Sequence, residues 1–164
     1  MSKQSVVIVS AIVMFGLLFL EIFYFQFHKV LQRDVVAEVM ISSEVSESSN
    51  DVIETKPVLQ GQFVEIDAVH KGSGTAMIIE QENSTYVRFE NFKVTNGPAL
   101  YVYLSDAETP GQTLESLGNY VNLGKLKGNI GDQNYTIPAD FVGAKTVVIW
   151  CQRFGVLFTF ARFE

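Results

Sequence analysis

The sequence predicts an all-β domain, either an antiparallel β-sandwich or a partly closed barrel of about eight strands, preceded by an N-terminal transmembrane helix and a flexible linker. Three observations predict it. A strongly apolar stretch lies near the N-terminus, and a stretch rich in Ser and acidic residues follows it. From Gly61 onward, short runs of Val, Ile, Phe, Tyr and Thr alternate with clusters of Gly, Asn and Pro.

The apolar stretch covers residues 6–27, after an N-terminal tail of residues 1–5. As a helix, its roughly 22 residues are long enough to cross the ~30 Å hydrocarbon core of a bilayer. No small-residue cleavage site follows it, which favours an uncleaved signal anchor over a signal peptide. We therefore expect a single-pass membrane protein with its C-terminal domain extracytoplasmic, although the flanking Lys and Arg residues do not fix the orientation.

The next segment, residues 28–60, reads as an acidic, Ser-rich linker. Its sequence "DVVAEVMISSEVSESSNDVIETKPVLQ" has no sustained apolar period and cannot bury enough surface to offset the entropy of ordering. A second interpretation applies to "DVVAEVM" alone, which could extend the membrane helix by a turn or two. In either case we expect the linker to hold a separate domain, residues 61–164, away from the bilayer.

The strands expected in this domain follow the apolar runs, and turn signals such as "HKGSG", "VTNGP", "KGNIGD" and "QRFG" separate them. No stretch after Gly61 keeps a helical period for three turns. The expected strands are residues 62–69, 75–81, 85–92, 99–105, 120–126, 134–138, 145–151 and 156–163.

If every connection reverses the chain direction, the first, third, fifth and seventh connections lie at the same end of the domain. Four residues with potential chemistry would then gather at one rim, namely His70, Asn96, Lys127 and Cys151. The long connection between Ser105 and Asn119 is the weakest step, because a crossover there would separate the last two residues from the others.

Cys151 is the one cysteine of the chain and ends an expected central strand. Strand alternation places Val147, Ile149 and Cys151 on one face and Val148 and Trp150 on the other. At this last position a thiol could be half-buried yet reachable, and Arg153 would favour the thiolate if the strand continued. The residue pattern also fits a simpler role, in which Cys151 is a small apolar core residue.

Composition excludes several classes of function. A net charge of −6 and a pI near 4.9 argue against a nucleic-acid partner, which requires clustered Lys and Arg. A single cysteine excludes an intrachain disulfide and a multi-cysteine zinc site. The chain contains no Gly-rich phosphate loop, no G-x-S-x-G elbow and no zinc-type spacing, so hydrolase and nucleotide-dependent activities have no support.

Four segments together resemble the DM13 domain family, in order and in spacing. They are "GQFVEIDAVHKGSGTAMII", "VRFENFKVTNGPALYVYLS", "LGKLKGNIGDQNYTIP" and "VVIWCQRFGVLFTFARF". The resemblance implies a β-rich extracellular module of an electron-transfer system. The resemblance also implies that the cysteine of this module acts as a bare thiol or holds a prosthetic group such as haem. The motifs put that cysteine at Cys151, its aromatic neighbours at Trp150 and Phe154, and its histidine at His70.

The family's Gly-Pro turn corresponds to Gly97 and Pro98, and two positions depart from the pattern. Ala99 stands where an acidic residue is common, and Thr159 stands where glycine is common. The resemblance implies Cys151 as the redox residue and Cys151, His70, Trp150 and Phe154 as a cofactor site. Separately, the residue spacing gives no candidate for a site that binds a metal ion directly.

Two hypotheses follow. One is a membrane-tethered redox module with a redox or cell-surface protein partner. The other is a cell-surface binding or structural domain in which Cys151 only fills the core.

Overall fold

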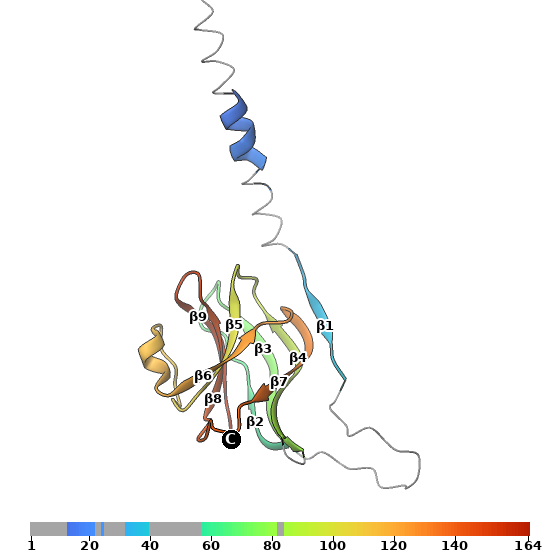
Figure 1. Cartoon of the computed structure of the whole chain (residues 1–164), viewed down its shortest axis with the longest axis vertical. Coiled ribbons are helices and arrows are strands. Elements are labelled where there is room, and N and C mark those ends of the chain that lie inside the picture. Colours follow the sequence, from blue (N-terminus) through green and yellow to red (C-terminus); the bar gives the residue numbers. More distant parts are fainter. Residues whose placement is uncertain (1–12, 22–23, 25–31, 40–56, 82–83) are drawn as a thin grey trace, which may run out of the picture. The chain divides into compact units, whose positions relative to one another are not determined.

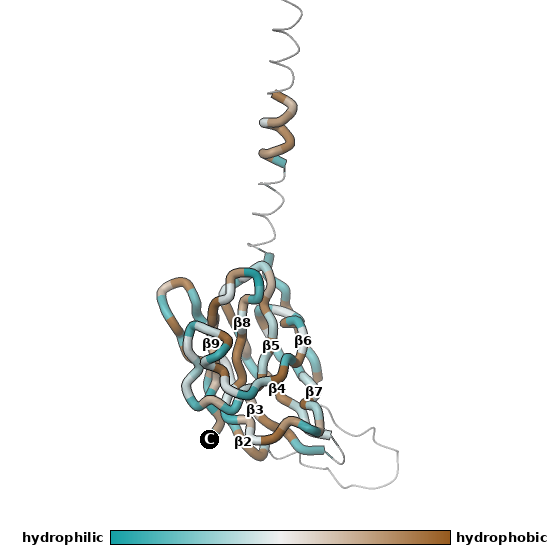
Figure 2. Tube along the Cα trace, turned by 60° about the vertical axis from the view of Figure 1, so that its left-hand side comes forward, coloured by the Kyte–Doolittle hydropathy of each residue, from teal (hydrophilic) through white to brown (hydrophobic). Residues whose placement is uncertain are grey.

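The computed structural model describes residues 13–21, 24, 32–39, 57–81 and 84–164. The chain divides into two compact units, Met1–Gln32 and Arg33–Glu164. In the first unit, residues 13–21 are helical and mostly hydrophobic (Figure 2). The large apolar side chains of this helix are exposed. Within the residues described, no helix has both the length and the apolarity needed to span a membrane. Most of the predicted span, residues 6–27, lies outside them.

The second unit is a two-layer β-sandwich, as one of the two predicted architectures requires (Figure 1). A five-stranded sheet has the order β1-β7-β4-β3-β2, and a four-stranded sheet has the order β6-β5-β8-β9. All pairings are antiparallel except that of β1 with β7, which is parallel. The elements are β1 (Val35–Ala37), β2 (Pro57–Gln62), β3 (Gly72–Gln81), β4 (Ser84–Val94), β5 (Leu100–Ser105), a 3-10 helix η1 (Leu114–Leu117), β6 (Tyr120–Lys125), β7 (Ile130–Ile137), β8 (Thr146–Cys151) and β9 (Val156–Arg162).

Seven of the eight predicted strands correspond to β3 through β9, but the first, residues 62–69, was wrong. Strand β2 lies earlier, over residues 57–62, and Phe63 makes only an isolated bridge to Ala161. The chain then leaves the five-stranded sheet, because the amide of Val64 donates to Phe160 of β9. Asp67 next closes a turn by accepting hydrogen bonds from the amides of Val69 and His70, each 2.7 Å long.

The main core lies between the two sheets and contains aromatic rings in edge contact, such as Phe63 with Phe89 at 5.0 Å. A second apolar cluster covers the outer face of the four-stranded sheet. Its buried members are Tyr103, Leu117, Val148, Trp150 and Leu157. The residues of β8 are therefore buried on both faces, as the sequence predicts for a central strand.

Strand β1 is a feature that the sequence did not predict. Residues 35–37 were assigned to the linker or to an extension of the membrane helix, yet they pair with residues 130–132 of β7. Two glycines allow the close approach, because a Cβ atom on Gly131 would collide with the backbone of Val36 in β1, and one on Gly128 with the backbone of Asp34 just before it. Residues 57–60, also assigned to the linker, begin β2.

Side chains on β4 and β7 fix β1 in place. The guanidinium of Arg88, which is 4% exposed, donates to the carbonyl of Glu38 at 3.2 Å and pairs with Glu90 and Asp132. The carboxylate of Glu38 accepts from the amide of Asn134 at 2.8 Å and pairs with Lys127 at 2.7 Å. The ion pair lowers the pKa of Glu38 against the opposing effect of its partial burial. Residues 33–39 thus belong to the folded unit.

Candidate functional site

Cys151 is the last residue of β8, and the predicted alternation of this strand is confirmed. Val147, Ile149 and Cys151 belong to the main core, whereas Val148 and Trp150 belong to the outer cluster. Cys151 pairs with Leu100 of β5 on one side and with Val156 of β9 on the other. Because Cys151 belongs to the main core, its side chain is directed between the two sheets.

The side chain of Cys151 is fully buried, at 0% exposure, so the expectation of a partly accessible sulfur was wrong. Two turns enclose the end of β8. The amide of Gln152 donates to Ala99 at 2.9 Å, and the amide of Gly155 donates back to the carbonyl of Cys151 at 2.9 Å. Position at a strand end therefore does not bring exposure here, because the next connection packs over the same end.

The predicted rim is present: four connections lie at one end of the sandwich. They are residues 63–71, 95–99, 126–129 and 152–155, and we use the name rim for this end. The register supports the grouping, since the start of β3 pairs with the end of β4, and the start of β5 pairs with the ends of β6 and β8. The long connection between β5 and β6 reverses the chain, which was the uncertain step.

His70 lies on the rim, held by an acidic partner that sequence reasoning missed. Its Nδ1 lies 2.7 Å from Oδ2 of Asp67, and its ring packs edge-on against Phe158 with centroids 4.6 Å apart. The hydrogen bond from the His70 side chain is the largest cause that lowers the pKa of Asp67 to about 2. The signal was available in the sequence, because an Asp three residues before a His closes this kind of turn.

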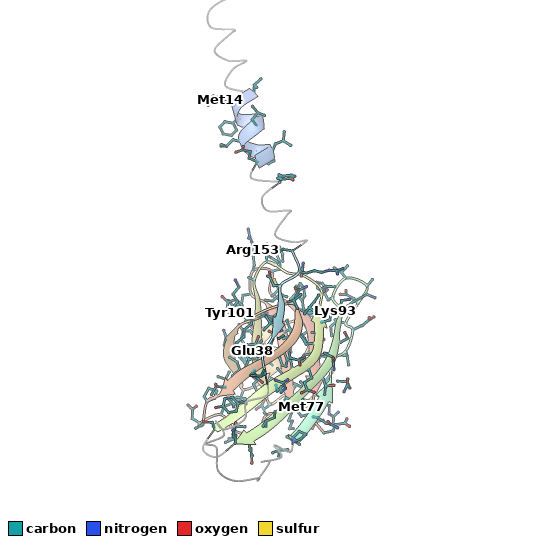
Figure 3. All side chains as sticks on the ribbon, turned by 90° about the vertical axis from the view of Figure 1, so that its right-hand side faces the viewer. Met14, Glu38, Met77, Lys93, Tyr101 and Arg153 are labelled. Atoms are coloured by element: carbon teal, nitrogen blue, oxygen red, sulfur yellow. The ribbon has the colours of Figure 1, made fainter. Side chains whose placement is uncertain are left out.

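The aromatic residues proposed as neighbours of the cysteine do not converge on it. Trp150 is 1% exposed and lies in the outer cluster, on the opposite face of β8 from Cys151. Phe154 is 65% exposed in the turn that joins β8 to β9. Arg153 is exposed in the same turn, and because β8 ends at Cys151 it does not continue the cysteine's face (Figure 3). The cofactor roles of these residues stay predictions.

A haem held by Cys151 does not fit this arrangement. Such a ligand needs a deep apolar pocket that leaves the sulfur free to reach iron. Here even one added methyl is excluded at Gly97, where a Cβ would lie 2.7 Å from the Leu100 side chain and 2.8 Å from the Phe158 ring. Within the described residues, no group of three or more His, Cys, Asp or Glu side chains could hold a metal ion. The site's chemistry is that of a thiol in a closed apolar core.

Comparison with known proteins identifies the family. No curated protein is significantly similar to the chain. Among solved structures, it resembles a single-site mutant of Candida albicans superoxide dismutase 5, with 14% identity, a TM-score of 0.47, and coverage of 66% of this chain and 92% of that one. The family model described as "Electron transfer DM13" matches residues 62–163, which include β3 through β9 and all four rim connections. The chain therefore belongs to the DM13 family of electron-transfer domains.

Proposed function

We propose that this chain is a membrane-tethered, extracytoplasmic redox module whose redox group is the thiol of Cys151. Membership of an electron-transfer family supports a redox role. The observation that carries the proposal is the place of the thiol. Cys151 is the one cysteine of the chain, and it lies at a strand end that is hydrogen-bonded to the turns 95–99 and 152–155.

Exchange at this thiol requires the rim to open, because Cys151 is enclosed. The turn after β8 is suited to that, since it contains four exposed residues and Gly155 has a φ of 63°. On opening, Cys151 loses its proton and the thiolate attacks one sulfur of a partner disulfide. The partner's other sulfur leaves as a thiolate and takes up a proton, which leaves a mixed disulfide.

The chain has no second cysteine, so the mixed disulfide must be resolved by a thiol from outside the chain. That thiol attacks the partner's sulfur, which joins the two outside sulfurs in a disulfide and releases Cys151 as a thiol. A protein that carries an exposed disulfide is therefore the class of partner we propose. No prosthetic group is needed for this cycle.

The membrane tether rests on the apolar stretch 6–27. Its helical residues expose large apolar side chains, with Met14 at 73%, Phe15 at 76% and Phe19 at 71%. Such a surface is unfavourable in water and favourable in hydrocarbon. We propose that this segment anchors the chain with the β-domain outside the cytoplasm.

A cell-surface binding or structural domain is the alternative, and one observation favours it. Cys151 is 0% exposed among aliphatic and aromatic side chains, as a cysteine that only fills the core would be. The two functions differ in what happens when the thiol is removed. Only the redox function depends on the sulfur.

Native-state thiol exchange tests the proposal. The full chain in nanodiscs is treated with glutathione disulfide, and formation of the mixed disulfide at Cys151 is followed by mass spectrometry. Hydrogen exchange of the β8 amides gives the rate of global unfolding in the same sample. We expect exchange much faster than global unfolding, and its complete loss in Cys151→Ala.

The matched control is Ile149→Val, which shortens a side chain on the same face of β8 and keeps the thiol. It should retain exchange in spite of some loss of stability. If the thiol of the natural chain reacts only as fast as the domain unfolds, and Cys151→Ala supports normal function in cells, the structural alternative replaces the redox proposal.

A further inference from the structure

The basic residues of the sandwich gather at the rim. Arg153 and Lys93 lie toward the same end of the sandwich in Figure 3, with Met77 toward the other. Lys125 ends β6 at this end, and Lys71 immediately precedes β3. The full set of basic residues at the rim end is Arg33, Lys71, Lys93, Lys125, Lys127 and Arg153.

Part of this charge is neutralised and part is not. Lys71 pairs with Glu65 at 3.3 Å, and Lys127 pairs with Glu38 at 2.7 Å. Lys93, Lys125 and Arg153 are exposed, and they make no ion pair with any residue that the structure describes. Two exposed acidic residues also lie at this end, Asp34 before β1 and Asp67 in the turn that holds His70. Among the described residues, the exposed cations without an ion pair outnumber these two carboxylates, so the rim keeps an excess of accessible positive charge; they are Arg33, Lys93, Lys125 and Arg153.

The opposite end of the sandwich has the reverse character. Among the residues that the structure describes at this end, Lys145 and Arg162 are the basic ones, and they share one carboxylate, that of Glu108. Acidic residues otherwise predominate in the strand ends and connections there, namely Glu80, Asp106, Glu115, Asp140 and Glu164. The folded unit is thus polarised along its strands, although the whole chain is acidic with a net charge of −6.

Two apolar side chains project among the rim cations. Phe154 is 65% exposed next to Arg153, and Val69 is 68% exposed two residues before Lys71. Exposed aromatic and aliphatic tips beside Lys and Arg are the composition of surfaces that enter the interface of a bilayer. The redox exchange proposed above makes no use of either side chain.

The N-terminal strand enters the folded unit at the rim. β1 is parallel to β7, which starts at the rim, and the amide of Asp34 donates to the side chain of Asn129 there at 2.7 Å. Only residues 28–33 separate this point from the end of the apolar stretch. Six residues span at most ~20 Å even when fully extended.

We propose that the rim docks on the surface of a bilayer that contains anionic lipid, with Phe154 and Val69 in the headgroup region and the unpaired cations against lipid phosphates. This proposal rests on the membrane anchor of the proposed function. The anchor and the rim enter the membrane from the same end of the folded unit, and the acidic end faces away. In the proposed arrangement the domain rests on the bilayer, in place of the expectation that the linker holds it away.

A tryptophan reporter tests the proposal in the full chain. Phe154→Trp is placed in nanodiscs of phosphatidylcholine, alone or mixed with phosphatidylglycerol, that carry brominated acyl chains as quenchers. We expect quenching in the mixed bilayer that weakens as salt is added. Trp150, which is 1% exposed, gives the background in the unaltered chain. The matched reporter is Val142→Trp, at an 81% exposed position on the opposite end, which should stay unquenched.

Charge removal supplies the second measurement. Lys93→Gln in the Phe154→Trp background should lower the ratio of docked to undocked domains about fivefold, the effect of one cation near an anionic surface. Lys145→Gln, at the opposite end, should leave the ratio unchanged. Equal quenching of the two reporters, or none at Phe154→Trp in a chain that does enter the nanodisc, overturns the docking proposal.

The two proposals fail differently. A chain that does not incorporate into nanodiscs refutes the anchor, and the docking falls with it, whereas thiol exchange at Cys151 is measured independently. Thiol exchange is therefore measured in nanodiscs of pure phosphatidylcholine, where the rim is expected to stay undocked and the turn after β8 is free to open. A chain that docks on the mixed bilayer but shows no thiol exchange in pure phosphatidylcholine leaves the rim proposal supported and the redox proposal refuted. Docking that persists in pure phosphatidylcholine and at high salt contradicts the role given to the cations.

Discussion

Gly72 and Thr159 should be energetically coupled, because the side chain of Thr159 fills the space that a Cβ atom on Gly72 would occupy. A Cβ atom on Gly72 would lie 2.5 Å from Cβ and 2.6 Å from Cγ2 of Thr159. No change of the threonine's χ1 relieves the first contact, since Cβ is fixed by the backbone. Gly72→Ala must therefore push β3 away from β9, at a cost of about 1–3 kcal/mol for overpacking.

Thr159→Gly removes all three atoms that the new methyl would meet, namely Cβ, Cγ2 and Oγ1 of Thr159. In that background Gly72→Ala should become stabilising by about 0.5 kcal/mol, since alanine restricts the unfolded chain more than glycine does. The coupling free energy in the double-mutant cycle is then about 2 kcal/mol. Thr159→Ala keeps the Cβ atom, so its cycle with Gly72→Ala should show only part of this coupling free energy.

Urea unfolding of residues 33–164, followed through the fluorescence of Trp150, measures each free energy of unfolding. Trp150 is the one tryptophan of the chain and is 1% exposed, so its emission changes strongly on unfolding. The control is Gly61→Ala, whose Cβ would meet the backbone of Arg162. Gly61→Ala should lower the free energy of unfolding by the same amount whether residue 159 is Thr or Gly. Additivity of Gly72→Ala and Thr159→Gly within about 0.5 kcal/mol would refute the close approach of the two strands.

Three further predictions concern the rim, strand β1 and the buried hydroxyl of Tyr135. Replacing His70 with Ala should raise the pKa of Asp67 from about 2 toward its ordinary value of 3.8, which a carboxyl NMR titration measures; an unmoved pKa would contradict the hydrogen bond between the two side chains. Because the folded-state pKa is depressed, the stability from Asp67 is complete above pH ~4 and is lost as the pH falls through about 2. Removing residues 33–39 takes away the backbone pairing of β1 and one acceptor of Arg88. Urea unfolding should then show a free energy of unfolding lower by at least about 2 kcal/mol. An unchanged midpoint would mean that β1 is not docked in solution. Tyr135→Phe removes a buried hydroxyl that donates to Gln133 at 2.7 Å. The free energy of unfolding should fall by about 1–2 kcal/mol in the same assay. An unchanged free energy of unfolding would mean that the hydroxyl is hydrated in the folded state.

Local patterns in the sequence predict much of this fold. Alternation along β8 assigns each residue from Val147 to Cys151 to its correct face, because a side-chain period of two is a property of the strand itself. The shared rim of His70 and Cys151 also follows from the sequence, since successive antiparallel reversals bring alternate connections to one end.

Features that depend on distant partners could not be predicted in this way. β1 has only three residues, and its position is fixed by glycines and an Arg88 network that lie at least 50 residues away along the chain. The burial of Cys151 depends on turn 95–99, which packs over the end of β8. The error over residues 62–69 has the same origin, because a hydrogen bond to β9 removes Val64 from the strand that its apolar pattern predicts.

Strand β1 changes what a proteolytic cut between residues 39 and 57 would do. These residues join β1 and β2, which lie on opposite edges of one sheet, so both ends of the segment are fixed to the same folded unit. A protease that cuts once within it does not by itself free the domain, because β1 stays paired with β7 and held by Arg88 and Asn134. Under the membrane tether proposed above, shedding of the domain would require β1 to dissociate as well, and the rate of release would report the opening of one sheet edge rather than the rate of cleavage.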